Sequence, residues 1–144
     1  MRILVLNGPN LNLLGVREPG LYGTVDYDGL VALIQKECDA LGVQVRFYQS
    51  NHEGDLVDAI QAARLDCDGI VLNPGAYTHT SIAILDALKA VALPAAEVHI
   101  TDINQREEFR KVSYAGMACQ AHFIGQGLAG YLNAVRWLAG GSEQ

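Results

Sequence analysis

Several residue types that would mark a secreted or membrane protein are scarce or absent from this sequence. The 144 residues include three cysteines, Cys38, Cys67 and Cys119, an odd number without paired spacing, which argues against a disulfide framework and a zinc knuckle. No run of about eighteen apolar residues occurs, and the apolar opening ends at Asn7 before a secretory segment could form. These absences predict a cytoplasmic protein that has no membrane partner.

Basic residues and metal-binding patterns are also scarce. Ten Lys and Arg against sixteen Asp and Glu give a net charge of -6, with no basic stripe that could bind a phosphate backbone, so nucleic acid is not an expected partner. The four histidines show no paired ligand spacing, which argues against a metal site. The chain has no Gly-x-Ser-x-Gly motif, so it lacks the nucleophile elbow of many hydrolases.

What the chain does contain is an alternation of strand-length and helix-length apolar patterns. A hydrophobic content of 50% with 18% charged residues fits one globular domain over residues 1–144. Strand patterns occupy 2–7, 43–49, 69–73, 96–100 and 121–124, and helical patterns follow each of them. The alternation predicts an α/β fold, a flavodoxin-like, doubly wound, five-stranded parallel sheet in the order 2-1-3-4-5 with right-handed crossovers.

Three local patterns predict where helices begin and end. Gly42 follows a helical pattern over residues 27–41 and stands where a C-terminal cap is expected. Residues 50–53, Ser-Asn-His-Glu, have the capping-box pattern and predict the start of the next helix. Residues 104–110, which carry two arginines, resemble a single capped helical turn.

The stretch at 69–81 combines a buried strand with a polar loop. Its apolar run shows no polar alternation, as expected of a parallel strand covered on both faces, and Asn73-Pro74-Gly75 ends it. Ligands of open α/β sheets bind outside the carboxyl ends of the strands, so Asn73, Tyr77 and His79 are placed to face a substrate. With strands one, three and four adjacent, Asn10, Asn73 and His99 should meet in one crevice. The alternative is a turn that is merely polar.

Two further features suggest catalysis, and each has a structural alternative. Side chains alternate along a strand, so Glu97 and His99 project to the same side, where the carboxylate can orient or charge the imidazole. A histidine satisfied for structural reasons would give the same pattern. Residues 11–23 form a long connection bounded by glycine that carries Arg17 and Tyr22, which suggests a lid, although a tolerated surface insertion is also possible.

The sequence Gly-Gln-Gly-Leu-Ala-Gly at 125–130 matches the dinucleotide fingerprint and lies between a predicted strand and a predicted helix. No second strand of a βαβ unit follows it, and no acidic residue lies about twenty positions further on. Close packing of helix against strand therefore accounts for the glycines better than NAD does.

Several motifs in one order carry a resemblance to a known family. They are Asn-Gly-Pro-Asn-Leu-Asn-Leu-Leu-Gly at 7–15, Arg-Glu-Pro at 17–19, Tyr-Gly at 22–23, Asn-Pro-Gly-Ala-Tyr-Thr-His-Thr-Ser at 73–81, Glu-Val-His-Ile at 97–100 and Arg-Glu-Glu-Phe-Arg at 106–110. The chain resembles type II 3-dehydroquinate dehydratase over nearly its whole length. The resemblance implies reversible anti elimination of water from 3-dehydroquinate, giving 3-dehydroshikimate through an enolate. It also implies no cofactor, no metal and a dodecamer built from trimers, and it fits either aromatic biosynthesis or quinate breakdown.

The resemblance also implies a role for each matching position. Tyr22 corresponds to the base at C2, Arg17 to the lid cation that favours its phenolate, and His99 to the acid that protonates the departing hydroxyl. The remaining positions are Asn10 (holding the water that stabilises the enolate), Glu97 (orienting the site), Asn73, His79 and Arg110 (binding substrate hydroxyls), Ile100 and Thr101 (holding the carboxylate with backbone N-H groups), and Asp86 (offered by a neighbouring subunit). Thr101 and Gln105 stand where the family more often has serine and histidine.

The residues alone leave more than one function open. An enolate route needs a base, a donor for the oxyanion and an acid, and the expected crevice supplies a Tyr, an Asn and a His. A Schiff-base route needs a desolvated lysine at a strand end, whereas Lys36, Lys89 and Lys111 lie on predicted helices or beyond them. The main alternative to an enzyme is a flavodoxin-like module that binds a small anion with Arg17, Arg110 and loop N-H groups.

Overall fold

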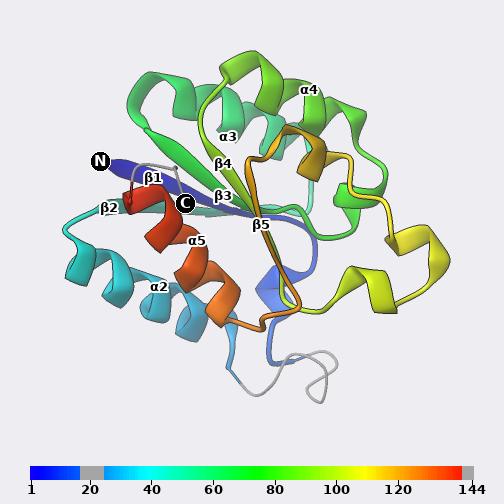
Figure 1. Cartoon of the computed structure of the whole chain (residues 1–144), viewed down its shortest axis with the longest axis horizontal. Coiled ribbons are helices and arrows are strands. Elements are labelled where there is room, and N and C mark those ends of the chain that lie inside the picture. The colour runs from blue at the N-terminus through cyan, green and yellow to red at the C-terminus, as the bar shows by residue number, and fades with distance from the viewer. Residues whose placement is uncertain (17–24, 141–144) are drawn as a thin grey trace.

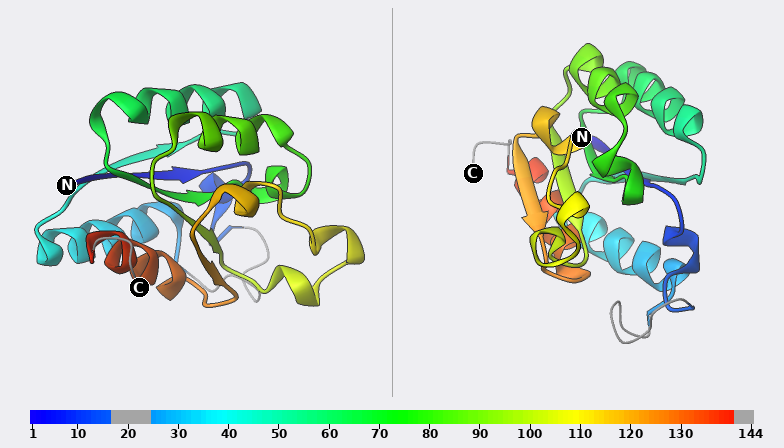
Figure 2. Two further views of the ribbon diagram at one scale, coloured as in Figure 1. Left: turned by 45° about the horizontal axis from the view of Figure 1, so that its top comes forward. Right: turned by 90° about the vertical axis from the view of Figure 1, so that its right-hand side faces the viewer.

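The fold is a parallel sheet covered by helices on both faces (Figures 1 and 2). The computed structural model describes residues 1–16 and 25–140. The five strands of the sheet are β1 (Arg2–Asn7), β2 (Gln44–Gln49), β3 (Gly69–Asn73), β4 (Ala95–His99) and β5 (Ala121–Ile124). They are all parallel and lie in the order β2-β1-β3-β4-β5, which confirms the expected topology.

Two pairs of helices enclose the sheet. Helices α2 (Tyr27–Leu41) and α5 (Ala129–Ala139) lie on one face, and α3 (Glu53–Asp66) and α4 (Ile82–Val91) lie on the other (Figure 1). Strand side chains alternate between the two resulting cores, so Val5 and Val98 pack toward α2 and α5 while Leu6 packs toward α3 and α4. Glu97 lies next to Val98 in β4 and so projects toward the α3 and α4 side.

Burial separates the central strands from the edges. Every residue of β3 and β4 is buried, as the continuous apolar run before Asn73 predicts. Strand β2 is an edge strand with exposed Gln44 and Tyr48, as its alternating sequence predicts. Strand β4 runs from Ala95 to His99, one residue earlier at each end than expected.

The caps show where local sequence determines helix boundaries and where it does not. Gly42 ends α2 with φ 71°, as predicted, and Ser81 begins α4 by accepting a hydrogen bond from the Ile84 N-H. The capping box predicted at residues 50–53 is wrong. Helix α3 begins after His52, whose side chain makes no cap. The Ser50 hydroxyl accepts from the His52 N-H and donates to Asp55, so it does not cap the helix as the box requires.

Among residues 1–16 and 25–140, five short 3-10 turns join the main elements, mostly at the carboxyl end of the sheet. They are η1 (Leu11–Leu13), η2 (Gly75–His79), η3 (Ile103–Gln105), η4 (Glu108–Arg110) and η5 (Ala115–Ala118). The single helical turn expected over 104–110 is therefore two turns, and Asp102 caps the first by accepting from the Asn104 N-H. In the described part of the chain, no helix has both the length and the apolar character needed to cross a membrane.

Candidate active site

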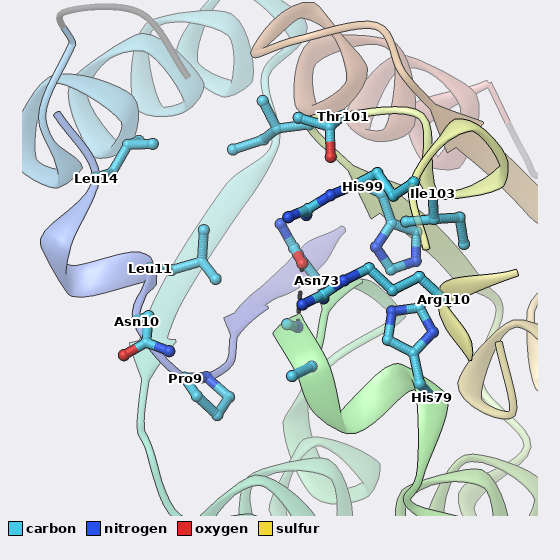
Figure 3. A pocket seen from close by; sticks show the side chains of 14 residues that line it. Pro9, Asn10, Leu11, Leu14, Asn73, His79, His99, Thr101, Ile103 and Arg110 are labelled. Carbon is cyan, nitrogen blue, oxygen red and sulfur yellow. Dashed lines mark hydrogen bonds between the residues drawn. The ribbon is translucent and has the colours of Figure 1, made fainter. Parts of the chain in front are cut away.

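A pocket opens at the carboxyl end of the sheet, where the loops after β1, β3 and β4 meet (Figure 3). The residues that line it are Pro9, Asn10, Leu11, Leu14, Asn73, Gly75, Ala76, His79, His99, Ile100, Thr101, Ile103, Arg106 and Arg110. Asn10, Asn73 and His99, which the strand order was expected to bring to one crevice, all lie in this wall. Figure 3 shows the rings of His79 and His99 directed toward the same cavity.

The other residues selected from the sequence lie elsewhere. Tyr77, which was expected to face a substrate with Asn73 and His79, is not among the lining residues and donates its hydroxyl to the Asn51 carbonyl oxygen at 3.0 Å. Glu97 is buried behind His99 and does not reach the pocket. Asp86 is exposed on α4 and is not among the residues that line the pocket of its own chain. Arg17 and Tyr22 lie outside the described residues.

The loops after β1 and β3 pack against each other with glycine at the contact. A Cβ on Gly8 would lie 2.2 Å from the Pro74 carbonyl oxygen, so only glycine allows this approach. Asn10 follows in the left-handed region with φ 71°, a conformation that asparagine adopts more readily than most residues, and its N-H donates to Asn51 Oδ1 at 3.1 Å. The close approach of Gly8 to Pro74 and the hydrogen bond from the Asn10 N-H therefore fix the position of the Asn10 backbone at the pocket.

Glu97 and His99 form a buried pair in β4. His99 Nε2 lies 2.7 Å from Glu97 Oε2, and the two side chains are 6% and 2% exposed. An ionised carboxylate can only accept, so Nε2 donates and Nδ1 remains free for a ligand. The pairing expected from strand alternation is thus present, with the imidazole between the carboxylate and the pocket.

Hydrogen bonds keep Glu97 ionised in spite of its burial. Burial alone would raise the pKa of this carboxyl, but donors from His99, Ser113 and His122 outweigh it and lower the pKa from 4.5 to about 2. Ser113 donates to Oε2, and His122 Nδ1 lies 2.6 Å from Oε1. The site therefore holds a negative charge directly behind the imidazole of His99.

His79 is held by the backbone on the far side of the pocket. Its Nδ1 lies 2.7 Å from the Val112 carbonyl oxygen, which can only accept, so Nδ1 carries the hydrogen and Nε2 is left as an acceptor. Burial lowers the pKa of His79, and the positive charges of His99, Arg110 and Arg106 add to the effect. A neutral His79 can accept a hydrogen bond from a ligand hydroxyl.

Asn73 is held in place by a buried polar chain. Its Nδ2 donates to the Tyr131 hydroxyl at 2.9 Å, and that hydroxyl donates to Asn7 Oδ1 at 2.6 Å. Asn73 Oδ1 also accepts from the Gly75 N-H at 3.2 Å. Asn7 and Asn73 are partners in the β1–β3 register, so one tyrosine of α5 ties the ends of the two strands together.

Two arginines make one rim of the pocket positive. Arg110 Nε lies 2.5 Å from Glu107 Oε2, and its guanidinium stacks on Phe109 at 5.2 Å from the ring centroid. The Arg106 N-H donates to the Ile103 carbonyl oxygen, whereas its guanidinium has no hydrogen-bond or ion-pair partner among residues 1–16 and 25–140. Sequence reasoning did not assign Arg106 to the site, although it begins the same Arg-Glu-Glu-Phe-Arg motif. The two guanidinium groups suit an anionic or hydroxyl-rich ligand.

The glycines at 125–130 serve packing in this structure. The Gly125 and Gly127 N-H groups donate to the His99 and Ile100 carbonyl oxygens, each at 3.0 Å. A Cβ on Gly130 would lie 3.3 Å from Val98 Cγ1, so the start of α5 sits tightly on β4. Among the described residues, no three His, Cys, Asp or Glu side chains are grouped so that they could hold a metal ion.

Comparison with known proteins gives a consistent result. Residues 1–139 match the family model described as dehydroquinase class II. The chain is 53% identical over 137 residues to a 3-dehydroquinate dehydratase of Lachnospira eligens, covering 94% of this chain and 93% of the relative. It is 49% identical over 135 residues to a 3-dehydroquinate dehydratase of Caldicellulosiruptor bescii, covering 93% of each.

Solved structures agree with the sequence comparison. The type II dehydroquinase of Butyrivibrio crossotus superposes with a TM-score of 0.94 at 51% identity, covering 96% of this chain and 97% of that one. The type II dehydroquinase of Propionibacterium acnes gives a TM-score of 0.93 at 43% identity, covering 96% of each chain. The same arrangement of strands and helices is therefore shared at substantial sequence identity.

Proposed function

This chain belongs to the class II dehydroquinase family, and from that premise we propose how its pocket dehydrates 3-dehydroquinate. A base removes the proton from C2, and the electron pair moves onto the C3 carbonyl oxygen as an enolate. The C1–O bond then breaks, a C1–C2 double bond forms, and the departing hydroxyl takes a proton to leave as water. The product is 3-dehydroshikimate, and no cofactor is consumed.

The observation that carries this proposal is the buried Glu97–His99 pair at the pocket wall. Hydroxide is a poor leaving group unless it is protonated, so the reaction needs an acid beside C1. Glu97 occupies Nε2 of His99 and leaves Nδ1 available. We propose that the proton on Nδ1 is the one transferred to the departing hydroxyl. Glu97 orients the ring and stabilises the imidazolium.

Other residues of the pocket bind the substrate or its enolate in this proposal. Asn10 holds a water that stabilises the enolate oxygen, and the N-H groups of Ile100 and Thr101 hold the carboxylate. Asn73, His79 and Arg110 bind hydroxyls. No lysine is among the described residues that line the pocket, which favours the enolate route over a Schiff base.

The base and its activator lie outside the described residues and are assigned by family resemblance. Tyr22 takes the C2 proton, and Arg17 favours its phenolate. A phenol has an unperturbed pKa near 10, so it needs a nearby cation to act as a base at neutral pH.

Formation of the conjugated enone gives a direct test. Adding 3-dehydroquinate to the enzyme should produce the ultraviolet absorbance of the product, and Tyr22→Phe should abolish that signal while calorimetry still records binding. A flavodoxin-like anion-binding module would instead bind the compound and give no enone with either protein. That outcome would overturn the proposed function.

A trimer is the smallest active unit that we propose, assembled further into a dodecamer, with Asp86 contributed by a neighbouring subunit. Asp86 is exposed on α4 and is not among the residues lining its own pocket, which supports a role across an interface.

We also place the enzyme in the cytoplasm as one catalytic domain over residues 1–144. Its three buried cysteines are unpaired, as is usual in a reducing compartment.

Mixed oligomers test the shared site. Asp86→Ala and His99→Ala subunits should each be nearly inactive alone, but together they should regain activity, because some pockets then combine an intact His99 with a neighbour's Asp86. Asp58→Ala, which changes an exposed carboxylate of α3, serves as the matched control and should be active without mixing. A fully active monomer in a sedimentation experiment that also records turnover would refute the shared site.

A further inference from the structure

A second histidine binds the carboxylate that orients His99. His122 is on the edge strand β5 and pairs in register with Glu97 of β4, so both side chains project from the same face of the sheet. His122 Nδ1 lies 2.6 Å from Glu97 Oε1, and its side chain is 45% exposed. One buried carboxylate therefore holds two imidazoles, His99 at the pocket wall and His122 at the protein surface.

The carboxylate has little freedom to favour one imidazole by moving. Oε2 accepts from His99 and Ser113, and Oε1 accepts from His122. Gly116 covers the group so closely that a Cβ there would lie 2.5 Å from Oε1. Because position and orientation are fixed, the two imidazoles share a single negative charge.

We propose that His122 is a positioning residue that shares Glu97 with His99 and thereby sets how readily His99 gives up its proton. This inference rests on the proposed role of His99 as the acid. Of the two imidazoles only His122 is open to solvent, and when it takes up a proton it becomes a cation beside Glu97. That cation neutralises Glu97, and the proton of His99 is then held less firmly and transferred more easily to a leaving hydroxyl.

A substitution at His122 leaves in the chain the other charged and titratable groups around the pair. His79, Arg106 and Arg110 line the pocket that His99 faces. Cys119, which follows η5, lies near Glu97, and its thiol remains neutral because burial and then the Glu97 charge raise its pKa to about 12. These groups set a common background for His99, on which the effect of His122 can be measured.

A pair of substitutions separates charge from structure. His122→Asn keeps an N-H donor close to the place of Nδ1 but cannot take up a proton, and His122→Leu removes both donor and charge. Each variant is titrated by NMR of the imidazole carbons, with His99→Asn used to assign the His99 signal. We expect the midpoint of His99 to rise by about one pH unit in both variants, at the lower end of the range for a nearby charge because His122 is half exposed.

Turnover adds a second readout. With 3-dehydroquinate, the alkaline limb on which the acid is lost should move to higher pH by the same amount in His122→Asn. An unchanged His99 midpoint in His122→Asn would overturn the inference, and so would a change in unfolding midpoint alone, which a purely structural histidine would give. If the unmodified enzyme forms no enone, the proposed function fails, while the NMR titration still decides whether the two histidines share Glu97.

Discussion

Two groups of ion pairs, one at each end of the sheet, differ in their exposure to water. At the amino end, Asp66 pairs with Arg46 at 2.6 Å and with Arg2 at 3.4 Å, and all three side chains are about 40% exposed (39–41%). At the carboxyl end, Glu97 and His99 pair at 2.7 Å with exposures of only 2% and 6%. The Arg46–Asp66 and Glu97–His99 pairs are similar in length, but only the first is exposed to water.

This difference indicates which charges serve stability and which serve chemistry. Exposed pairs are screened and contribute little, so the amino end can change without much consequence. A buried carboxylate is costly unless every lone pair is satisfied, and apolar replacements are often as stable. The fold nevertheless buries Glu97 and supplies it with three hydrogen-bond donors. This arrangement is the one expected where the reaction requires a negative charge behind His99.

The largest effect is expected from breaking the carboxyl end at its acid. His99→Ala should leave a folded protein that binds 3-dehydroquinate but turns it over about 10²- to 10⁴-fold more slowly, the usual contribution of a general acid. The enone assay and calorimetry measure the two properties. His52→Ala, which removes an exposed histidine that makes no side-chain cap, is the control and should have normal turnover. Residual activity within about tenfold of the unmodified enzyme would remove His99 from the role.

Glu97→Gln should give the next largest effect, visible in acid. The folded pKa is depressed from 4.5 to about 2, so ionised Glu97 stabilises the fold above pH 4.5, and this contribution is lost as the pH falls through about 2. The shift corresponds to about 3 kcal/mol. Denaturant unfolding between pH 7 and pH 2 should therefore show a gap between the two proteins that closes in acid. A gap that stays constant would contradict the assigned pKa.

Tyr131→Phe should have a smaller effect on the buried polar chain. Losing the hydroxyl leaves the Asn73 amide without its acceptor and Asn7 Oδ1 without a donor, which costs about 2 kcal/mol for buried groups. KM should rise because Asn73 is no longer held toward the pocket. Tyr48→Phe, on the exposed edge of β2, is the matched control. Equal stability of the two variants would show that the chain from Asn7 to Asn73 is unimportant.

Asp66→Asn should produce the smallest change, because it breaks only the exposed pairs at the amino end. We expect a shift in unfolding midpoint smaller than that of Glu97→Gln or Tyr131→Phe, decreasing further as salt is added, and unchanged turnover. A loss of turnover comparable to that of His99→Ala would invalidate the comparison between the two ends.

The sequence predicts the fold better than it predicts the interactions within the site. Helix and strand order follows from local apolar periodicity, and the meeting of Asn10, Asn73 and His99 follows from the strand order. The Glu97–His99 pair is also local, since it needs only the alternation of one strand. The capping box at 50–53 failed because the Ser50 hydroxyl bonds to the His52 N-H and to Asp55. A four-residue sequence pattern does not show which of these partners the hydroxyl takes.

Features that depend on register between distant segments could not be predicted. His122 reaches Glu97 only because β4 and β5 pair with Glu97 opposite His122, and a periodicity of two does not fix that register. Tyr131 lies in the helical pattern after the fifth strand, and periodicity alone does not show that its hydroxyl bonds to Asn73 at the end of β3. Arg106 was quoted in a motif without a role because only the folded chain places it on the rim.

The central claim is that one residue removes the C2 proton and another, His99, serves only the departing hydroxyl. Proton NMR of 3-dehydroquinate in D₂O with His99→Ala tests this separation directly. The account predicts that the variant exchanges the C2 proton for deuterium through the enolate while forming almost no enone, and that Tyr22→Phe does neither. If bound substrate keeps its C2 proton in the His99 variant, or if enone forms at the unmodified rate, the assignment of His99 as the acid for the leaving group is contradicted.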